Sequence, residues 1–383
     1  RPAELAGTPH AAVYAAAMDG LFDTYTSLIE PTVAFVRART PRDAQTSERA
    51  YTSATRAKAL DLLRGLLPMA TLTNVGLFGN GRAFEYLLTK LYAAEQHELR
   101  ELAGQLQAAL DALIPSFVKR AKSERGHAYQ AYLKASRANV AFSPQSSALS
   151  PQPSALGVES SVVLSAYDED AEQRVVAAVL YAHSDAPLAD VRAAVETMGA
   201  EERMTLLRAY IGERASRFHK PGRALEEARY SFDILADLGA YRDLQRHRML
   251  SQERQSYTVA HGFITPPELA EAGLAAQYQR AIEAAGAAFG QISARLPEAA
   301  QYAVPLACRV RWRITLNLRE LYHFCELRAA PQGHPTYRAI AQEMYRLVAA
   351  THPRLAEGMR FVDLNEYALE RLDAERRLDT KLQ

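Results

Sequence analysis

One pattern constrains the fold of this 383-residue chain more than any other: part of its first half recurs in its second half. Three pairs of residues stand at a constant separation of 237 positions: Pro68 and Pro305, Asn80 and Asn317, and Arg82 and Arg319. The apolar pattern of Ala17–Leu28 also resembles that of Ala281–Ile292. Because self-similarity indicates a repeated supersecondary unit, we expect two copies of one helical arrangement.

A segment rich in proline and serine divides the chain. Phe142–Ser160 reads FSPQSSALSPQPSALGVES and contains a single charged residue. This composition is typical of a flexible linker. We therefore expect three regions: a helical half-repeat over residues 1–141, a linker over 142–160, and a larger domain over 161–383.

The two flanking regions differ in their apolar periodicity. Helical spacing predominates before the linker, over Ala15–Arg37, Ser53–Leu67 and Asn80–Leu113. After the linker, β-branched and aromatic runs predict strands at Ser161–Ser165, Ser231–Leu235 and Ser256–Phe263. Helices are expected at Asp170–Ala182, Leu188–Met198, Arg223–Tyr230, Ala240–Leu250, Pro266–Ala294, Pro305–Arg328 and Pro335–Ala350. The predicted fold is α+β and predominantly helical, with a small sheet in the C-terminal unit and none in the N-terminal unit.

The N-terminal copy lacks any counterpart of the strand-bearing part of the C-terminal copy. Two explanations are open: that part was lost, or it lies ahead of Arg1. We favour the second. The apolar stripe Leu62, Leu63, Leu66 and Leu67 is expected to need a second chain to cover it, which predicts a homodimer of tandem chains.

Composition excludes several classes of partner. The net charge is +1, so the chain has no strong field for nucleic acid or for an anionic membrane. No apolar run approaches the ~20 residues that span a bilayer. Cys308 and Cys325 are the only cysteines, and they lack a metal-ligand spacing. These features favour a reduced, cytoplasmic protein without a disulfide framework or a metal site.

Two motifs could carry chemistry. Arg246, His247 and Arg248 are consecutive, and Ser256 follows after seven intervening residues. Guanidinium groups of this kind suit phosphates and anionic rings. The second motif, Thr315–Arg328, reads TLNLRELYHFCELR.

Together these motifs resemble the signature of the flavin-dependent thymidylate synthases, over about residues 160–358. The resemblance implies FAD as cofactor, and dUMP, methylenetetrahydrofolate and NADPH as small-molecule partners. It implies no protein nucleophile, because the flavin carries the redox chemistry. The cofactor-binding residues that it implies are Arg246, His247, Arg248, Asn317, Arg319 and His323, with Asn80 and Arg82 in the N-terminal copy.

The same resemblance implies that Arg64, Ser256 and Arg328 bind the substrate. Two alternatives stay open. Asn317 could instead cap a helix, and Arg328 could instead form a salt bridge with Glu320 or Glu326.

Four positions depart from the family pattern: Asp243, Arg254, Thr258 and Gln301. Gln301 replaces an arginine that the N-terminal copy keeps as Arg64, whereas Leu91 stands where the first copy would match Arg328. Each copy thus lacks one residue that the other copy keeps, which predicts a site composed of residues from both copies. The alternative is a degenerate flavin- or nucleotide-binding pseudoenzyme with a structural role.

Overall fold

The computed structural model describes residues 2–138 and 161–382. The expected linker over residues 142–160 lies outside them. The described residues form two compact units: unit 1 comprises residues 2–23, 67–138 and 280–305, and unit 2 comprises 24–66, 161–279 and 306–382. Helices α1 (His10–Arg39) and α12 (Ala275–Ser293) contribute residues to both.

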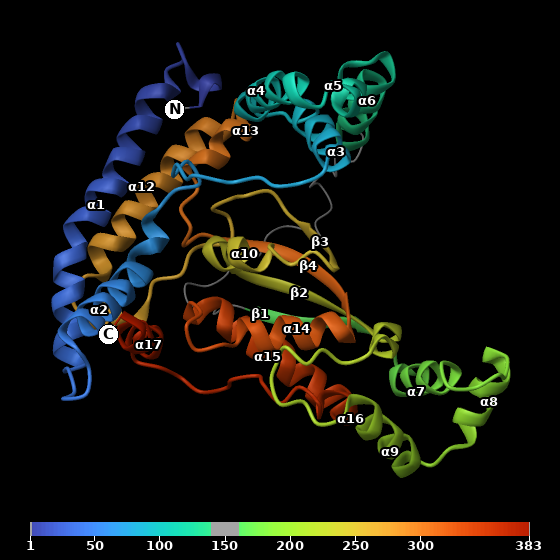
Figure 1. Cartoon of the computed structure of the whole chain (residues 1–383). Helices are drawn as coiled ribbons and strands as arrows, with labels where there is room; N and C mark the ends of the chain where they lie inside the picture. The colour runs from blue at the N-terminus through green and yellow to red at the C-terminus, as the bar shows by residue number, and fades with distance from the viewer. Residues whose placement is uncertain (1, 139–160, 383) are drawn as a thin grey trace, which may run out of the picture. The chain divides into compact units, whose positions relative to one another are not determined.

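In its described part, unit 1 has helices and no strand (Figure 1). Its other elements are η1 (Ala3–Leu5), α3 (Gly81–Tyr92), α4 (His97–Leu113), α5 (Pro115–Val118), η3 (Lys119–Lys122), α6 (Glu124–Ala138), α13 (Pro297–Ala300) and η6 (Gln301–Ala303). A small apolar core joins α3 to the helices that follow it. Its buried members are Leu88, Ala103, Val118 and Ala121.

Unit 2 contains the sheet and the helices that cover it. Before the sheet come α2 (Glu48–Leu63) and η2 (Arg64–Leu66). The strands are β1 (Ser161–Tyr167), β2 (Arg229–Asp237), β3 (Leu250–Arg254) and β4 (Arg309–Asn317). The remaining elements are α7 (Ala171–Tyr181), α8 (Leu188–Thr197), α9 (Ala200–Ile211), η5 (Arg223–Glu227), α10 (Leu238–Leu244), α11 (Pro267–Glu271), α14 (Leu318–Arg328), α15 (Pro335–Thr351), α16 (Pro353–Ala356) and α17 (Leu372–Leu382). The predicted α+β, mainly helical fold is confirmed.

The sheet is antiparallel, with strand order β1-β2-β4-β3. Alternate residues of β4 are buried, because successive strand side chains point to opposite faces. The buried set is Val310, Trp312, Ile314 and Leu316, all at most 2% exposed. The opposite face is polar, with an ion pair of 2.7 Å between Arg311 Nη1 and Asp233 Oδ2. Helix α15 packs against β1 and β2.

Two expectations about the sheet were wrong. Pro305–Arg328 was predicted to be one helix, but its first part is β4, the strand between β2 and β3. Ser256–Phe263 was predicted to be a strand, but it is irregular and makes only an isolated bridge from Phe263 to Cys308. Gly262 there has a φ of 70°, a left-handed conformation that interrupts a strand. The strand that pairs with β4 at this edge of the sheet is β3, which ends just before the predicted segment.

The repeated sequence adopts the same local structure twice. Turns η2 and η6 stand at the 237-residue separation of the repeat. Asn80 and Asn317 are the N-caps of α3 and α14, with nearly identical φ/ψ of −81°/167° and −82°/165°. In unit 1, the equivalent prolines Pro68 and Pro305 face each other in an antiparallel bridge. The residues that the sequence repeat pairs therefore have matching local backbone structure at these two places.

The predicted leucine stripe does not need a second chain. Leu62, Leu63 and Leu66 are at most 6% exposed within the single chain. The expectation that the stripe stays uncovered was wrong for these three residues, whereas Leu67 is half-buried. The most exposed apolar side chains of the first copy lie in the segment Thr71–Asn80, where Leu72 is 91% and Phe78 is 106% exposed.

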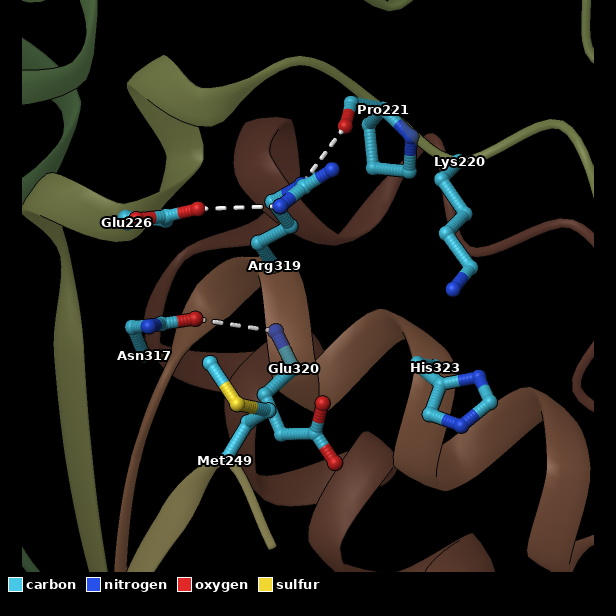
Figure 2. Close-up of a pocket in the computed structure, with 8 residues that line it drawn as sticks. All are labelled: Lys220, Pro221, Glu226, Met249, Asn317, Arg319, Glu320 and His323. Carbon is cyan, nitrogen blue, oxygen red and sulfur yellow. Dashed lines mark hydrogen bonds and ion pairs between the residues drawn. The ribbon is translucent and has the colours of Figure 1, made fainter. Parts of the chain in front are cut away.

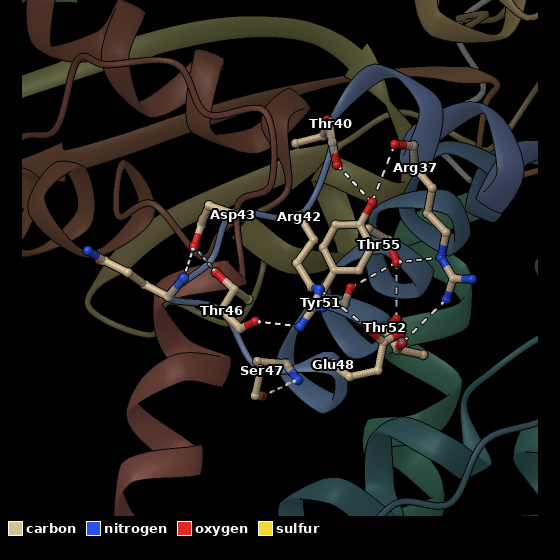
Figure 3. A network of polar contacts seen from close by, with 12 residues as sticks. Arg37, Thr40, Arg42, Asp43, Thr46, Ser47, Glu48, Tyr51, Thr52 and Thr55 are labelled. Carbon is tan, nitrogen blue, oxygen red and sulfur yellow. Dashed lines mark hydrogen bonds and ion pairs between the residues drawn. The ribbon is translucent and has the colours of Figure 1, made fainter.

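A polar network fixes the connection between α1 and α2 (Figure 3). The Tyr51 hydroxyl donates to the carbonyl oxygens of Thr40 at 2.9 Å and Arg37 at 3.3 Å. Ser47 is the N-cap of α2, and its hydroxyl accepts from the Ala50 amide. Thr46 donates to Asp43, which contributes most to holding the Asp43 pKa below its usual value. These contacts satisfy the loop polar groups that the helices leave unpaired.

Among the described residues, no helix is both long and apolar enough to cross a bilayer.

A buried ion pair anchors α14. Arg214 Nη1 and Nη2 each lie 2.6 Å from a carboxylate oxygen of Glu326, and the two side chains are 4% and 1% exposed. Arg214 also donates to the carbonyl oxygens of His219 and Gly358. A bidentate pair with these further acceptors satisfies a guanidinium inside the protein.

We predict that Glu326→Gln lowers the free energy of unfolding by about 3–5 kcal/mol, because it leaves the Arg214 charge buried without its counter-ion. Thermal unfolding followed by circular dichroism measures the effect. Glu357→Gln is the matched control, since Arg208 and Glu357 form a similar but exposed pair, at 60% and 40%. The control should change little. Equal effects of the two substitutions would contradict this account.

Candidate functional site

The three consecutive signature residues lie in the turn that leads from α10 into β3, which we call the RHR turn (Arg246–Arg248). Helix α10 is short. Its N-cap is the buried Asp237, whose side chain accepts from the Ala240 amide, and its C-cap is Gln245. The side chain of Arg246 is 71% exposed, and that of Arg248 is exposed. The RHR turn thus presents two guanidiniums to solvent on either side of an imidazole.

That imidazole points inward. The side chain of His247 is 3% exposed, and its Nδ1 lies 2.8 Å from Glu320 Oε1 on α14. Arg328 Nε, at the other end of α14, donates to His247 Nε2 at 2.9 Å. The ring packs on Phe324 with 4.5 Å between ring centroids. Both ring nitrogens are therefore engaged, and the RHR turn is tied to α14 by one side chain.

The geometry defines the tautomer of His247. A guanidinium can only donate hydrogen bonds, so Nε2 must be the acceptor and Nδ1 must carry the proton given to Glu320. His247, Glu320 and His323 also have ligand atoms within 4.8 Å of one another, as a metal site would. A metal requires a lone pair on the imidazole nitrogen that faces it. In the structure, hydrogen bonds to Glu320 and Arg328 account for both ring nitrogens of His247.

A pocket of about 120 Å³ opens beside this group (Figure 2). Lys220 and Pro221 approach it from the loop before η5, Glu226 from η5 itself, and Met249 from just before β3, while the other lining residues come from the β4–α14 junction. Its lining is Lys220, Pro221, Glu226, Met249, Asn317, Arg319, Glu320 and His323. The sequence-predicted Asn317, Arg319 and His323 therefore meet at one place, next to the RHR turn.

Two of these predicted residues have structural partners. Asn317 Oδ1 accepts from the Glu320 amide at 2.9 Å, so the capping role left open by the sequence is observed. Arg319 donates to the Pro221 carbonyl and to Glu226 Oε1, both at 2.9 Å. Hydrogen bonding from Arg223, and then from Arg319, holds the pKa of Glu226 below its usual value. The Arg319 charge is thus neutralised within the chain.

Burial acts on the other ionisable groups of α14. It lowers the pKa of His323, an effect that the Glu320 carboxylate partly opposes. It also lowers the pKa of Arg328, whose guanidinium lies 5.8 Å from the Tyr337 ring centroid. Arg328 bonds to His247, not to Glu320 or Glu326 as in the salt-bridge alternative. At neutral pH His323 consequently presents an uncharged ring to the pocket.

Arg64 lies beside α10, also in unit 2. Its Nη1 is 3.1 Å from Asp243 Oδ2, and its Nη2 is 3.9 Å from Asp237 Oδ1. Gly239 permits this approach, because a Cβ there would lie 3.1 Å from Arg64 Nη2. Asp243, one of the four departures from the family pattern, therefore holds the arginine that was predicted to grip the substrate.

The remaining predicted residues are elsewhere. Ser256 is exposed in the loop after β3 and does not line the pocket. Asn80 and Arg82 belong to unit 1; Asn80 caps α3, and Arg82 lies 3.5 Å from Glu85. Two of the departures from the family pattern, Arg254 and Thr258, contact residues close to them in the chain. Arg254 stacks on Tyr257, and the Thr258 hydroxyl accepts from the Ala260 amide.

Sequence reasoning missed the acidic residues of the site. Glu320 joins His247 to α14, and Glu226 pairs with Arg319. A signal for Glu320 was present, because Asn317 and Glu320 have the N-cap and N3 spacing of a capping box. Nothing in the sequence pointed to Glu226, Lys220 or Met249, which come from distant segments.

Comparison with known proteins gives the family. The family described as thymidylate synthase complementing protein (Thy1) matches residues 163–354. A protein of Chlamydia muridarum named "UPF0159 protein" is 41% identical over 94% of this chain and 68% of its own length. A UPF0159 protein of Thermoplasma acidophilum is 35% identical over 88% of the chain and 66% of its own length. The chain thus spans about two thirds of these relatives.

More distant matches cover less of the chain. The flavin-dependent thymidylate synthase of Sulfurisphaera tokodaii is 33% identical over 34% of this chain and 54% of its own length. A crystal structure of the UMP/dUMP methylase PolB from Streptomyces cacaoi, bound with 5-Br dUMP, matches with a TM-score of 0.45. It is 19% identical and covers 53% of this chain and 96% of that one. Since the Thy1 match spans half of the chain and the UPF0159 relatives match nearly all of it, the chain belongs to the Thy1 family.

Proposed function

We propose that this chain binds FAD along the RHR turn and the N-terminal half of α14, and that it acts in the flavin-dependent methylation of dUMP with methylenetetrahydrofolate and NADPH. One observation supports this proposal most strongly. Among the described residues, Lys220 and Arg248 have no hydrogen bond or ion pair, whereas Glu226, Arg319 and Glu320 beside the same pocket are partnered. Two free cations beside a pocket suit a diphosphate.

The residues present fit such a group. Arg246 and Arg248 are exposed, and the nearest acid to Arg246 is Asp243 at 3.8 Å. Met249 is 73% exposed and offers an apolar surface to a planar ring. His323 adds an uncharged imidazole, because burial lowers its pKa. Cationic, apolar and neutral polar side chains therefore occur together beside the pocket, as a dinucleotide with a planar ring requires.

In this proposal each residue of the chain binds or orients. Lys220, Arg246 and Arg248 neutralise the diphosphate. Met249 and His323 face the ring. Bound flavin supplies the electron transfer, for which no side-chain nucleophile is needed. His247 acts as a positioning residue: it is buried and holds the RHR turn against α14 through Glu320 and Arg328.

The pocket alone is too small for the whole cofactor. Its volume of about 120 Å³ is below the roughly 300–1,000 Å³ typical of small-molecule sites. We propose that a second chain completes it, in a homodimer of tandem chains. Light scattering should then give the mass of two chains, and the mass of one chain at micromolar concentration would contradict the dimer.

A second candidate function is nucleotide or flavin binding without turnover. The observation in its favour is that Arg64 and Arg319 are neutralised by Asp243 and Glu226. An arginine that must grip a substrate phosphate would first have to give up these partners. The two predictions that follow test the FAD and dUMP binding on which the first candidate depends.

For FAD binding, we expect Arg248→Ala to weaken affinity by ~10-fold or more, the loss of one charged hydrogen-bonding partner. Titration of the purified protein with FAD, followed by flavin absorbance and fluorescence, measures it. Arg346→Ala removes an exposed arginine of α15 and should leave the affinity unchanged. A parent protein that takes up no FAD at tens of micromolar would overturn the proposal.

For dUMP binding, Arg64→Ala should weaken affinity by ~10-fold while flavin content stays the same. Asp243→Gln removes the competing carboxylate and should strengthen dUMP binding, because the Arg64 guanidinium becomes available. Isothermal titration of dUMP into the FAD-loaded proteins tests both, after thermal unfolding has shown that the variants are folded. If neither substitution changes dUMP affinity, Arg64 is structural and its proposed role in binding dUMP is contradicted.

A further inference from the structure

Unit 1 contains a pocket of its own. It has a volume of about 380 Å³ and lies among α3, η3 and α6. That volume falls within the roughly 300–1,000 Å³ range of small-molecule sites. It is lined chiefly by three arginines, one glutamate and two tyrosines: Arg82, Arg120, Arg125, Glu85, Tyr86 and Tyr129.

The pocket carries an excess of positive charge. Glu85 is its acidic residue, and its side chain is 10% exposed. Arg120 Nε lies 3.1 Å from Glu85 Oε1, and Arg82 Nη1 lies 3.5 Å from Oε2. Arg125 is exposed and has no hydrogen bond or ion pair among the residues that the structure describes. Three guanidiniums against one carboxylate leave two positive charges, which a phosphate monoester of about −1.5 to −2 would balance.

Glu85 preorganises the cationic side. It is buried on α3 and receives one guanidinium from its own helix and one from η3. The side chains of Arg82 and Arg120 remain 72% and 53% exposed, so their other donors can reach a ligand. A guanidinium held by one carboxylate loses less side-chain entropy when it binds an anion.

The aromatic side comes from Tyr86 and Tyr129, which are 51% and 42% exposed. Lys90 lies over the Tyr86 ring at 4.3 Å, and Tyr129 stacks with Tyr132 at 6.2 Å between ring centroids. These neighbours fix the ring positions. Exposed, oriented phenol rings are suited to stacking on a planar group.

The backbone brings the two sides together. Gly126 lies in the first turn of α6, where a Cβ would stand 2.0 Å from the Arg120 carbonyl oxygen. The absence of a side chain therefore allows α6 to approach η3. As a result Arg125 and Tyr129 lie beside Arg120.

We propose that this pocket of unit 1 binds a phosphorylated planar aromatic molecule of the size of a nucleoside monophosphate. The three arginines take the phosphate and the two tyrosines take the ring. The proposal rests on residues of unit 1 alone and does not depend on FAD or dUMP binding at α14.

The test uses the full chain with uridine 5′-monophosphate as probe and hydrogen–deuterium exchange to locate it. Binding should slow exchange in residues 81–90 and 119–129. Calorimetry should show that Arg125→Ala weakens the affinity for the nucleotide by ~10-fold or more. Lys134 is an exposed lysine on the same helix, and Lys134→Ala should leave that affinity unchanged. Tyr129→Ala should weaken the nucleotide several-fold, without weakening inorganic phosphate.

Three results would overturn the proposal. One is no slowing of exchange in residues 81–90 and 119–129 at millimolar nucleotide. Another is an Arg125→Ala protein that binds as tightly as the parent. The third is an equal loss of nucleotide affinity in Arg125→Ala and Lys134→Ala, which would show that the nucleotide is attracted only by the general positive charge. Slowed exchange confined to residues 246–250 and 317–323 would place the nucleotide at the α14 site and count against unit 1.

Discussion

The site in unit 2 depends on a single buried hydrogen-bonded chain, from Arg328 through His247 to Glu320. Its two ends are on α14 and its centre is on the RHR turn. The RHR turn has few other internal contacts, because Arg246 and Arg248 are exposed. In the low dielectric of the interior such a chain is stronger than its members would be in water. It fixes where the flanking guanidiniums emerge, and so it sets the geometry of any anion site beside the pocket.

Much of this could be predicted from the sequence, and the misses have physical causes. The helices α1, α2 and α15 follow clear apolar periodicity. Strand β4 was mistaken for helix although Arg309–Leu316 alternates charged or polar with apolar residues, the period-2 pattern of a half-buried strand. The polar edge strand β3 gave little signal, since only one of its sides is paired. The RHR and α14 motifs did indicate which residues meet. Glu226 could not be predicted, because it reaches Arg319 only through the tertiary fold, whereas Glu320 had a sequence signal in its capping-box spacing from Asn317.

The duplication explains why similar helices are used differently. Helices α3 and α14 start from equivalent asparagine caps. In unit 2, β4 leads into α14 and pairs with β2 and β3, which brings the RHR turn to the helix. In unit 1 the equivalent segment Thr71–Asn80 is extended but forms no strand, and α5 to α6 pack on α3 instead. The same helix face therefore meets Arg120, Arg125 and Tyr129, and a pocket of different chemistry results.

The protonation state of His247 tests the central claim most directly. Long-range ¹H–¹⁵N correlation spectra of the chain labelled at histidine distinguish the two neutral tautomers and the imidazolium, and a His247→Gln spectrum assigns the signal. The hydrogen-bonded chain predicts a proton on Nδ1 and none on Nε2, since Arg328 Nε can only donate to Nε2. A proton on Nε2, in either the other tautomer or the imidazolium, would contradict the arrangement and with it the proposed positioning of the RHR turn.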